Sequence, residues 1–377
     1  MNAARLGLDA LAVGLALSLN RWIRLLTNPF AARLYERIPA GALVLAALGL
    51  AVLSTAAYAL PFALVLFLAA RLVWGLAWSL LRLGTLLSAI EGGRATAAVD
   101  RARIGRALGN TRAIYGLGYF GGALYAPFAV EALGWQSAVI GAALLTLLLG
   151  LGPAALVGGW RRHAEVDERV EAAVRRALLD RRFIGLFMVA SSQYAVGAGI
   201  VPIGAGLRAA EIFAGGGSLL AFPAAATVIA GAFILGQRVA QVAWTPLAGR
   251  LADRALGPTF IASTLVSGAS VVALVFAHDA TAFVLLGAVA FFAGITATVG
   301  LELAIAHRTT AADRPRILGA YATWADAGAA TGALGAGFLA LAGTQVPFLS
   351  AVVLTAATLV AAPTVAASAL VVRASAR

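Results

Sequence analysis

Long apolar runs separated by short polar joints cover almost the whole chain. Most runs approach the roughly 20 residues that a helix needs to cross the hydrocarbon core of a bilayer. The runs are too long for barrel strands, and helices satisfy their own backbone hydrogen bonds. The pattern therefore predicts eleven transmembrane helices, near residues 7–29, 40–59, 61–90, 112–133, 135–157, 183–206, 221–248, 258–277, 281–306, 316–342 and 346–372.

The composition excludes an ordinary soluble domain. Of the 377 residues, 62% are hydrophobic and only 12% are charged. A soluble domain could not bury that much apolar side chain away from water. The chain contains no Cys, which excludes disulfides, thiol catalysis and Cys-ligated zinc within it. We therefore predict an all-α polytopic membrane protein.

Positive charge is concentrated in alternate joints. The net charge is +12, and all 28 basic residues are Arg. Basic joints of this kind face the cytoplasm, and the Arg residues form no single basic domain that would bind nucleic acid. The pattern places the C-terminus in the cytoplasm and, with an odd number of spans, Met1 outside. Arg208 is the exception, because it follows a span whose joint is expected outside.

Residues 20–37 and 237–254 are copies of each other, 217 residues apart. The matched pairs are Arg21 and Arg238, Pro29 and Pro246, Arg33 and Arg250, Leu34 and Leu251, Glu36 and Asp253, and Arg37 and Arg254. A repeat of this length predicts two related halves with a transport path between them. We expect an N-terminal bundle of five spans over 1–157, a cytoplasmic linker with a short amphipathic helix over 158–182, and a six-helix bundle over 183–377.

The repeat also predicts that one helix is missing at the front. The second half begins its first span near Phe183, well before Pro246, and the same interval before Pro29 lies ahead of Met1. A truncated gene model or a late start codon is favoured over a natural eleven-span protein. Residues 1–20 resemble a signal peptide, but the equivalent run before Arg238 is an internal span.

Two turns and one helix resemble motifs of the major facilitator superfamily. Residues 246–254, Pro-Leu-Ala-Gly-Arg-Leu-Ala-Asp-Arg, are similar to its motif A. Residues 28–37 form a weaker copy, with Ala32 in place of Gly and Glu36 in place of Asp. Residues 71–75, Arg-Leu-Val-Trp-Gly, resemble motif B, whereas the glycine-rich fifth helix matches motif C only loosely.

The resemblance implies a fold and a mechanism. It implies two helix bundles related by a pseudo-two-fold axis, with 11 of the usual 12 helices in this chain. It also implies secondary transport by alternating access, with the charged helices lining a central cavity. The motif A turns would act as gates through Pro29, Arg33, Glu36, Arg37, Pro246, Gly249, Arg250, Asp253 and Arg254.

Charged side chains inside the spans are the candidates for substrate binding and coupling, because a charge at a span centre costs at least about 2.5 kcal/mol. Arg71 is the deepest cation; the resemblance implies coupling, and a structural role is the alternative. Asp326 is the deepest acid, and it either pairs with an Arg to close a gate or carries protons. Glu302 is expected at the interface or in coupling, and Arg82 is expected to anchor a helix end.

Further polar candidates lie on the repeated helices. Arg21, Arg24 and Arg238 either line the cavity or extend toward the interface. Gln241 follows Arg238 at a spacing that lets the two share one helix face.

Aromatic and small residues give weaker signals. Tyr194, Trp324 and Trp74 are candidates for the cavity lining, with ordinary packing as the alternative for each. Glycines within 116–122 and 328–336 are expected to let helices cross closely.

Catalytic and metal-binding patterns are absent from the sequence. His163, His278 and His307 are too scattered for a metal site. No Ser, His and Asp have the spacing of a nucleophile and its base. We therefore expect no metal, no cofactor and no enzymatic activity.

The sequence predicts a secondary transporter of a small solute in the inner, or cytoplasmic, membrane. More Arg than acidic residues within the spans favours an anionic or amphiphilic solute, and proton coupling is the expected driving force. The lipid bilayer and protons are expected partners, nucleic acid is not, and a monomer is expected. The alternative is a transport-inactive membrane protein, either a sensor or the product of a truncated gene.

Overall fold

The computed structural model describes residues 10–60, 64–97, 104–157, 177–220, 222–224, 226–310 and 312–367. These residues form two compact units that exchange segments along the chain. Unit 1 combines Met1–Leu87, Gly121–Leu179 and Ala312–Asp326. Unit 2 combines Ser88–Phe120, Asp180–Ala311 and Ala327–Arg377. The predicted bundles over 1–157 and 183–377 stay a prediction, and most of the predicted linker lies outside the described residues.

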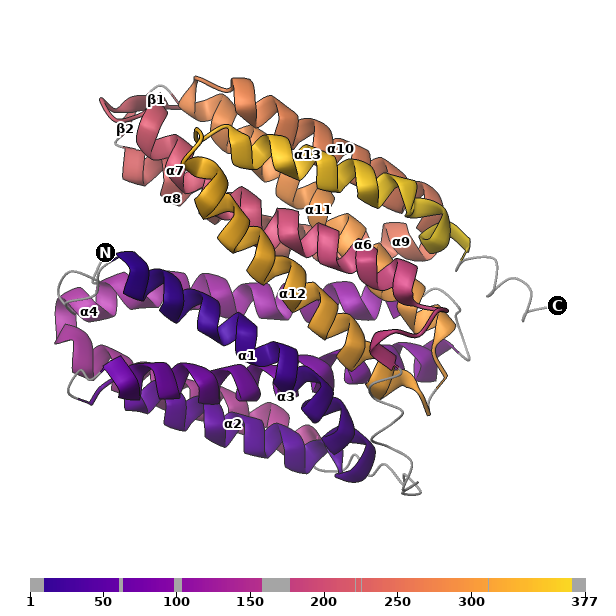
Figure 1. Cartoon of the computed structure of the whole chain (residues 1–377). Coiled ribbons are helices and arrows are strands. Elements are labelled where there is room, and N and C mark those ends of the chain that lie inside the picture. Colours follow the sequence, from indigo (N-terminus) through magenta and orange to yellow (C-terminus); the bar gives the residue numbers. More distant parts are fainter. Residues whose placement is uncertain are drawn as a thin grey trace. The chain divides into compact units, whose positions relative to one another are not determined.

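Unit 1 is built from the N-terminal helices and from parts of two others. The helices are α1 (Ala10–Arg37), α2 (Ala40–Ala57), most of α3 (Leu64–Ala97), the second part of α4 (Ile104–Val157) and the first half of α12 (Arg314–Ala340). Figure 1 shows α1, α2 and α3 along one another. Buried Tyr35 fastens α1 to α3, because its hydroxyl donates a 3.0 Å hydrogen bond to the Leu80 carbonyl.

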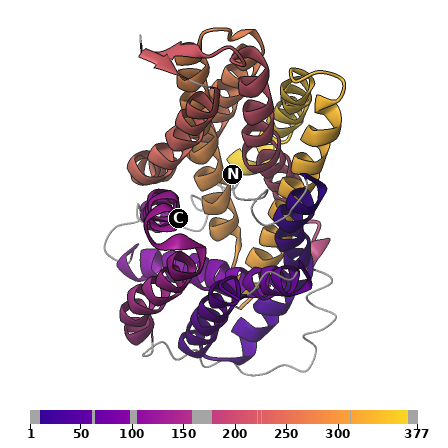
Figure 2. The same ribbon diagram turned by 90° about the vertical axis from the view of Figure 1, so that its left-hand side faces the viewer.

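Unit 2 contains most of the remaining helices and a small hairpin. Its elements are α6 (Ile184–Tyr194), α7 (Val201–Ile212), α8 (Ala226–Val239), α9 (Thr245–Arg254), α10 (Leu256–Phe276), α11 (Ala280–Arg308), α13 (Val346–Val360) and the strands β1 (Gly217–Leu219) and β2 (Phe222–Ala224). The strands pair antiparallel, with Gly217 opposite Ala224. Figures 1 and 2 show α10, α11 and α13 packed side by side. The sequence pattern did not predict the hairpin.

Two π-helical segments interrupt helices of unit 2. Residues Ala195–Ile200 join α6 to α7, and Ala240–Trp244 join α8 to α9. Such segments widen a helix by one residue per turn and are frequent at functional sites. Both occur beside residues of the candidate site, since Tyr194 precedes the first and Gln241 lies in the second.

Seven helices are long and apolar enough to cross a membrane among the described residues. They are Ala40–Ala57, Val65–Glu91, Ala132–Leu151, Ile184–Ile212, Leu256–Phe276, Ala280–Arg308 and Val346–Ala367, and each matches one of the eleven predicted spans. The other four spans stay a prediction. The predicted joint between the spans at 112–133 and 135–157 is confirmed as a break in α4, where Gly134 has φ 77°. Only Gly adopts such a backbone without strain.

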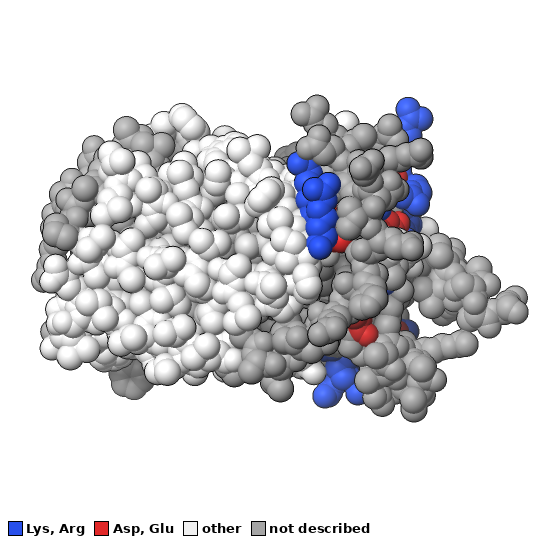
Figure 3. All heavy atoms as spheres, turned by 90° about the horizontal axis from the view of Figure 1, so that it is seen from below, with Lys and Arg blue, Asp and Glu red and all other residues white. Residues whose placement is uncertain are grey.

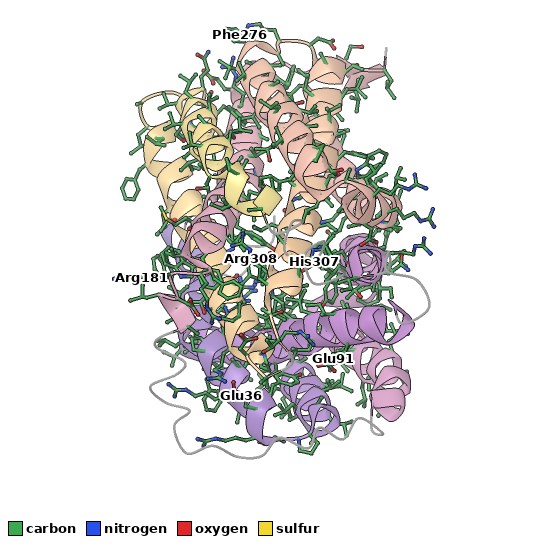
Figure 4. All side chains as sticks on the ribbon, turned by 90° about the vertical axis from the view of Figure 1, so that its right-hand side faces the viewer. Glu36, Glu91, Arg181, Phe276, His307 and Arg308 are labelled. Carbon is green, nitrogen blue, oxygen red and sulfur yellow. The ribbon has the colours of Figure 1, made fainter. Side chains whose placement is uncertain are left out.

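Charged residues leave much of the described surface bare. In the face shown in Figure 3, Arg, Asp and Glu gather toward one end, next to a broad area that carries none of them. Within unit 2, Phe276 at the end of α10 and Arg308 at the end of α11 lie at opposite ends, because these helices are antiparallel (Figure 4). Arg308 donates hydrogen bonds to the carbonyls of Arg182 and Thr364.

Glycine allows close helix crossing at some of the predicted positions. A Cβ at Gly328 or Gly332 would collide with the α6 backbone or its π-helical extension, and one at Gly116 would press on Gln241. The prediction is confirmed at these three positions. It is wrong at four others, because Cβ atoms would meet open space at Gly118, Gly121, Gly122 and Gly335.

Candidate functional site

A buried carboxylate of unit 1 gathers three polar partners, which we call the Asp326 cluster. Oδ1 of Asp326 lies 3.3 Å from Arg24 Nη2 and 3.3 Å from Arg82 Nη1. Oδ2 accepts a 2.8 Å hydrogen bond from the Asn28 amide. Both carboxylate oxygens are therefore occupied, and two guanidinium groups share one of them. Arg82 also packs over the ring of Tyr321, 5.9 Å from its centroid.

The positions of these residues follow from helix periodicity. Asn20, Arg24 and Asn28 are spaced four residues apart on α1, so they share one face. Arg24 also donates a 3.0 Å hydrogen bond from Nε to the Asn20 carbonyl. Arg82 approaches from α3 and Asp326 from α12, so the cluster joins three helices of unit 1.

The contacts of the Asp326 cluster bear on the predictions made for Arg82 and Asp326. The prediction that Arg82 anchors a helix end at the interface is wrong, since its side chain is only 9% exposed and pairs with Asp326. Asp326 pairs with Arg, as the gate hypothesis requires, but the gate itself stays a prediction.

A second buried carboxylate forms what we call the Glu302 cluster in unit 2. Arg112 on α4 forms a bidentate pair with Glu302 on α11, with Nε–Oε2 2.9 Å and Nη2–Oε1 2.5 Å. The same Nη2 donates a 3.1 Å hydrogen bond to the hydroxyl of Tyr194 on α6. Glu302 is 1% exposed. Its interfacial and coupling roles both stay predictions.

Sequence reasoning missed Arg112, which was not among the candidate residues. A second repeat could have found it, because residues 100–104 read Asp-Arg-Ala-Arg-Ile and residues 313–317 read Asp-Arg-Pro-Arg-Ile. From the ends of these segments, Arg112 and Asp326 follow at positions that differ by one residue. The two clusters therefore use neighbouring, not identical, positions of α4 and α12 in this repeat, with opposite charge.

The second motif A turn closes on the start of α4 within unit 2. The Asp253 carboxylate accepts hydrogen bonds from the backbone N–H groups of Gly105 at 2.8 Å and Arg106 at 2.9 Å. These N–H groups belong to the first turn of α4 and have no partner inside the helix. The positive end of the helix dipole also favours a carboxylate there. Gly249 lets the helices approach, because a Cβ at that position would collide with the Gly105 carbonyl.

The first motif A turn uses a different contact within unit 1. Glu36 Oε1 lies 2.8 Å from Arg316 Nε near the start of α12. The two atoms form an ion pair but lack the alignment of a hydrogen bond. Ala32, which replaces the expected Gly, faces Gly319, and a Cβ there would lie 2.7 Å from that of Ala32. The glycine needed for the close approach is thus supplied by α12.

The remaining motif A residues have varied surroundings. Pro29 lies inside α1, and Pro246 lies in the first turn of α9. Arg33 is half-buried, whereas the side chains of Arg37, Arg250 and Arg254 are exposed. The gating roles of all these residues stay predictions.

Arg71 lies apart from both clusters. Its guanidinium carbon is 5.5 Å from the ring centroid of Tyr58 and 5.3 Å from that of Phe67. These contacts stabilise the cation through the ring faces. Within the described part of the chain, no ion pair joins Arg71 to an acid. Its coupling role stays a prediction, as does cavity lining by half-buried Trp74 on the same helix.

The other predicted residues make local contacts. The Arg238 guanidinium lies 4.7 Å from the Tyr119 ring centroid, and Nη1 donates a 3.4 Å hydrogen bond to Gln241. Arg21 is half-buried on α1. Trp324 donates a 3.0 Å hydrogen bond to the Leu178 carbonyl, which connects α12 to the end of the linker. The described residues contain no group of three or more His, Cys, Asp or Glu that could bind a metal ion.

Comparison with known proteins identifies the fold. No protein-family model and no curated protein sequence matches the chain. The human organic anion transporter MFSD10 (TETRAN) is 16% identical, with a TM-score of 0.64 over 96% of this chain and 87% of that one. The transporter FucP, in an outward conformation, is 15% identical, with a TM-score of 0.69 over 94% of this chain and 90% of that one. The chain therefore has the fold of major facilitator superfamily transporters.

Proposed function

We propose that this chain is a multi-pass membrane protein that moves a small solute across the cytoplasmic membrane as a secondary transporter. The single observation that carries the proposal is the pair of buried ion clusters. Charges inside apolar helices are expensive, and in membrane proteins they mark substrate and ion pathways. The shared fold with two solved transporters supports the same conclusion.

The proposed mechanism is alternating access driven by protons. Asp326 and Glu302 are the buried acids of the two clusters, and each is paired with Arg on another helix. Protonation of such a carboxylate would remove its charge and release the Arg partner. The motif A turns, with Asp253 at the start of α4 and Glu36 at Arg316, would stabilise one state of the cycle.

The proposed solute is a small organic anion or an amphiphile. The described contacts of the Asp326 cluster join two Arg to one acid, and the likeness to MFSD10 agrees with an anion because that protein is an organic anion transporter. The proposal assigns small-solute transport rather than an enzymatic reaction. We also propose that the protein acts as a monomer and needs no metal or cofactor.

Transport by proteoliposomes tests the proposal. The full chain is reconstituted and given radiolabelled propionate, benzoate or lactate, with and without an imposed pH gradient. We expect gradient-dependent accumulation of at least one anion, abolished by a protonophore. Asp326→Asn should reduce accumulation at least tenfold, whereas Arg181→Gln, at an exposed position, should not. Absence of gradient-dependent accumulation for the whole panel would contradict the proposal.

A further inference from the structure

The surplus cation of the Asp326 cluster is its least expected feature. Arg82 and Arg24 both approach Oδ1 of Asp326, each at 3.3 Å, and Asn28 occupies Oδ2. One carboxylate therefore faces two guanidinium groups in a buried place. In the Glu302 cluster, one Arg meets one Glu in a bidentate pair with shorter contacts.

The repeat shows which of the two cations is the additional one. The face of α1 that carries Asn20, Arg24 and Asn28 corresponds, 217 residues later, to Gln237, Gln241 and Thr245. Arg24 is the only charged residue among these six positions. Gln241, in the place of Arg24, makes no ion pair and accepts a hydrogen bond from Arg238 instead. The corresponding face of unit 2 is therefore neutral.

The contacts of the two Arg residues also differ. Arg82 is 9% exposed and packs on the ring of Tyr321, so it is fixed by both the acid and the ring. Arg24 is 13% exposed, and its Nη2 lies 3.3 Å from the same carboxylate oxygen. Its Nε donates to the Asn20 carbonyl. Without Arg24, both oxygens of Asp326 would still have a partner, Arg82 on Oδ1 and Asn28 on Oδ2.

We propose that Arg24 is the anion-binding residue of this protein, and that the carboxylate of a small organic anion replaces Asp326 as its partner. Arg24 binds the incoming carboxylate, while Asp326 retains Arg82 and Asn28. The guanidinium is planar and donates two parallel hydrogen bonds to a carboxylate, which Lys cannot do. This inference rests on the proposed transport of a small solute and names the chemical group that the site recognises.

A binding experiment separates this inference from the transport proposal. The purified full chain is heated in detergent with propionate or benzoate, and with the neutral amides propionamide and benzamide as matched probes. A ligand that binds the folded state raises the melting temperature as its concentration rises. We expect at least one carboxylate, and neither amide, to raise the melting temperature of the wild type.

The variants identify the residue. Arg24→Gln reproduces the neutral residue of the repeat and should abolish the carboxylate-dependent shift. Arg24→Lys should retain only part of it, and Arg181→Gln should retain all of it. A carboxylate shift of equal size in Arg24→Gln would overturn the inference, as would the absence of a shift with both carboxylates in the wild type. Transport that persists in either case would leave the proposed function standing and remove only the role of Arg24.

Discussion

The Asp326 cluster and the Glu302 cluster both compensate a buried carboxylate with Arg, but they do so with different partners and distances. Each places a carboxylate and at least one Arg inside apolar helices. The Glu302 cluster is balanced and bidentate, with contacts of 2.5 and 2.9 Å. The Asp326 cluster has two cations at 3.3 Å and a neutral Asn. We infer that the Glu302 cluster holds its helices together, whereas in the Asp326 cluster Arg24 is the cation that we propose to exchange its partner.

The largest expected loss of stability comes from breaking the ion pair between Arg112 and Glu302. Glu302→Gln leaves the Arg112 guanidinium buried without its anion, because Glu302 supplies both oxygens of the bidentate pair. Removing one partner of a buried pair costs about 3–5 kcal/mol, and the partial exposure of Arg112 places this variant near the lower value. Chemical unfolding in detergent measures the loss.

A matched double variant separates the charge from the packing. Replacing both Arg112 and Glu302 by Met removes the two charges together, and apolar replacements of buried pairs are often close to neutral. We expect the double variant to recover most of the stability lost by Glu302→Gln. A double variant less stable than Glu302→Gln would show that the pair itself stabilises unit 2.

The next effect compares the two helix crossings. Gly249→Ala would force a Cβ into the Gly105 carbonyl, whereas Ala32→Gly removes the methyl group that faces Gly319 and costs only the helix propensity, about 0.5–1 kcal/mol. Overpacking of this kind costs about 1–3 kcal/mol. We expect Gly249→Ala to lower the melting temperature by more than Ala32→Gly does. Equal shifts would mean that the two crossings do not differ in closeness.

A smaller effect is expected at the cap of α4. Asp253→Ala removes the acceptor of two backbone N–H groups and should cost about 1 kcal/mol, as other N-terminal caps do. Asp253→Asn retains an acceptor, so it should fold normally while transport slows. Initial transport rates in proteoliposomes check the second part. Unchanged rates in Asp253→Asn would refute a gating role for this carboxylate.

The smallest expected effect on stability is that of Asp180, which lies outside the membrane spans. Hydrogen bonds from Arg182 lower the pKa of Asp180 below its ordinary value. A lowered pKa in the folded state stabilises the protein above the ordinary Asp pKa, and this contribution disappears as the pH falls through the lowered value. Asp180→Asn should therefore melt slightly lower than the wild type at neutral pH and equally at strongly acidic pH. A difference in melting temperature between the two proteins that grows on acidification would contradict the lowered pKa of Asp180.

The sequence predicted helices and turns better than it predicted partners. Seven spans and the break at Gly134 follow from local hydrophobicity and backbone preference, which are visible within about 20 residues. Arg112 and Glu302 are 190 residues apart, so no local pattern joins them. Arg82 was assigned to the interface for the same reason, because its partner lies on α12.

Arg208 shows how a local rule can fail for a physical reason. It contradicted the charge pattern of the predicted external joints. The structure buries it, with Nη1 3.2 Å from Glu211 and Nη2 donating to the Val275 carbonyl at the end of α10. An Arg compensated by an acid and a helix end is not a loop charge, and the positive-inside rule counts loop charges.

In the described contacts, the Glu302 cluster has one Arg for one acid, whereas the Asp326 cluster has two. The most direct test compares the melting temperatures of Arg112→Gln and Arg24→Gln, side by side and without ligand. We expect Arg112→Gln to melt well below the wild type, because Glu302 loses its bidentate partner. Arg24→Gln should melt at or above the wild type, because Asp326 retains Arg82 and Asn28. Equal losses of melting temperature in the two variants would show that Arg24 stabilises the fold as much as Arg112 does, and that the two clusters do not differ.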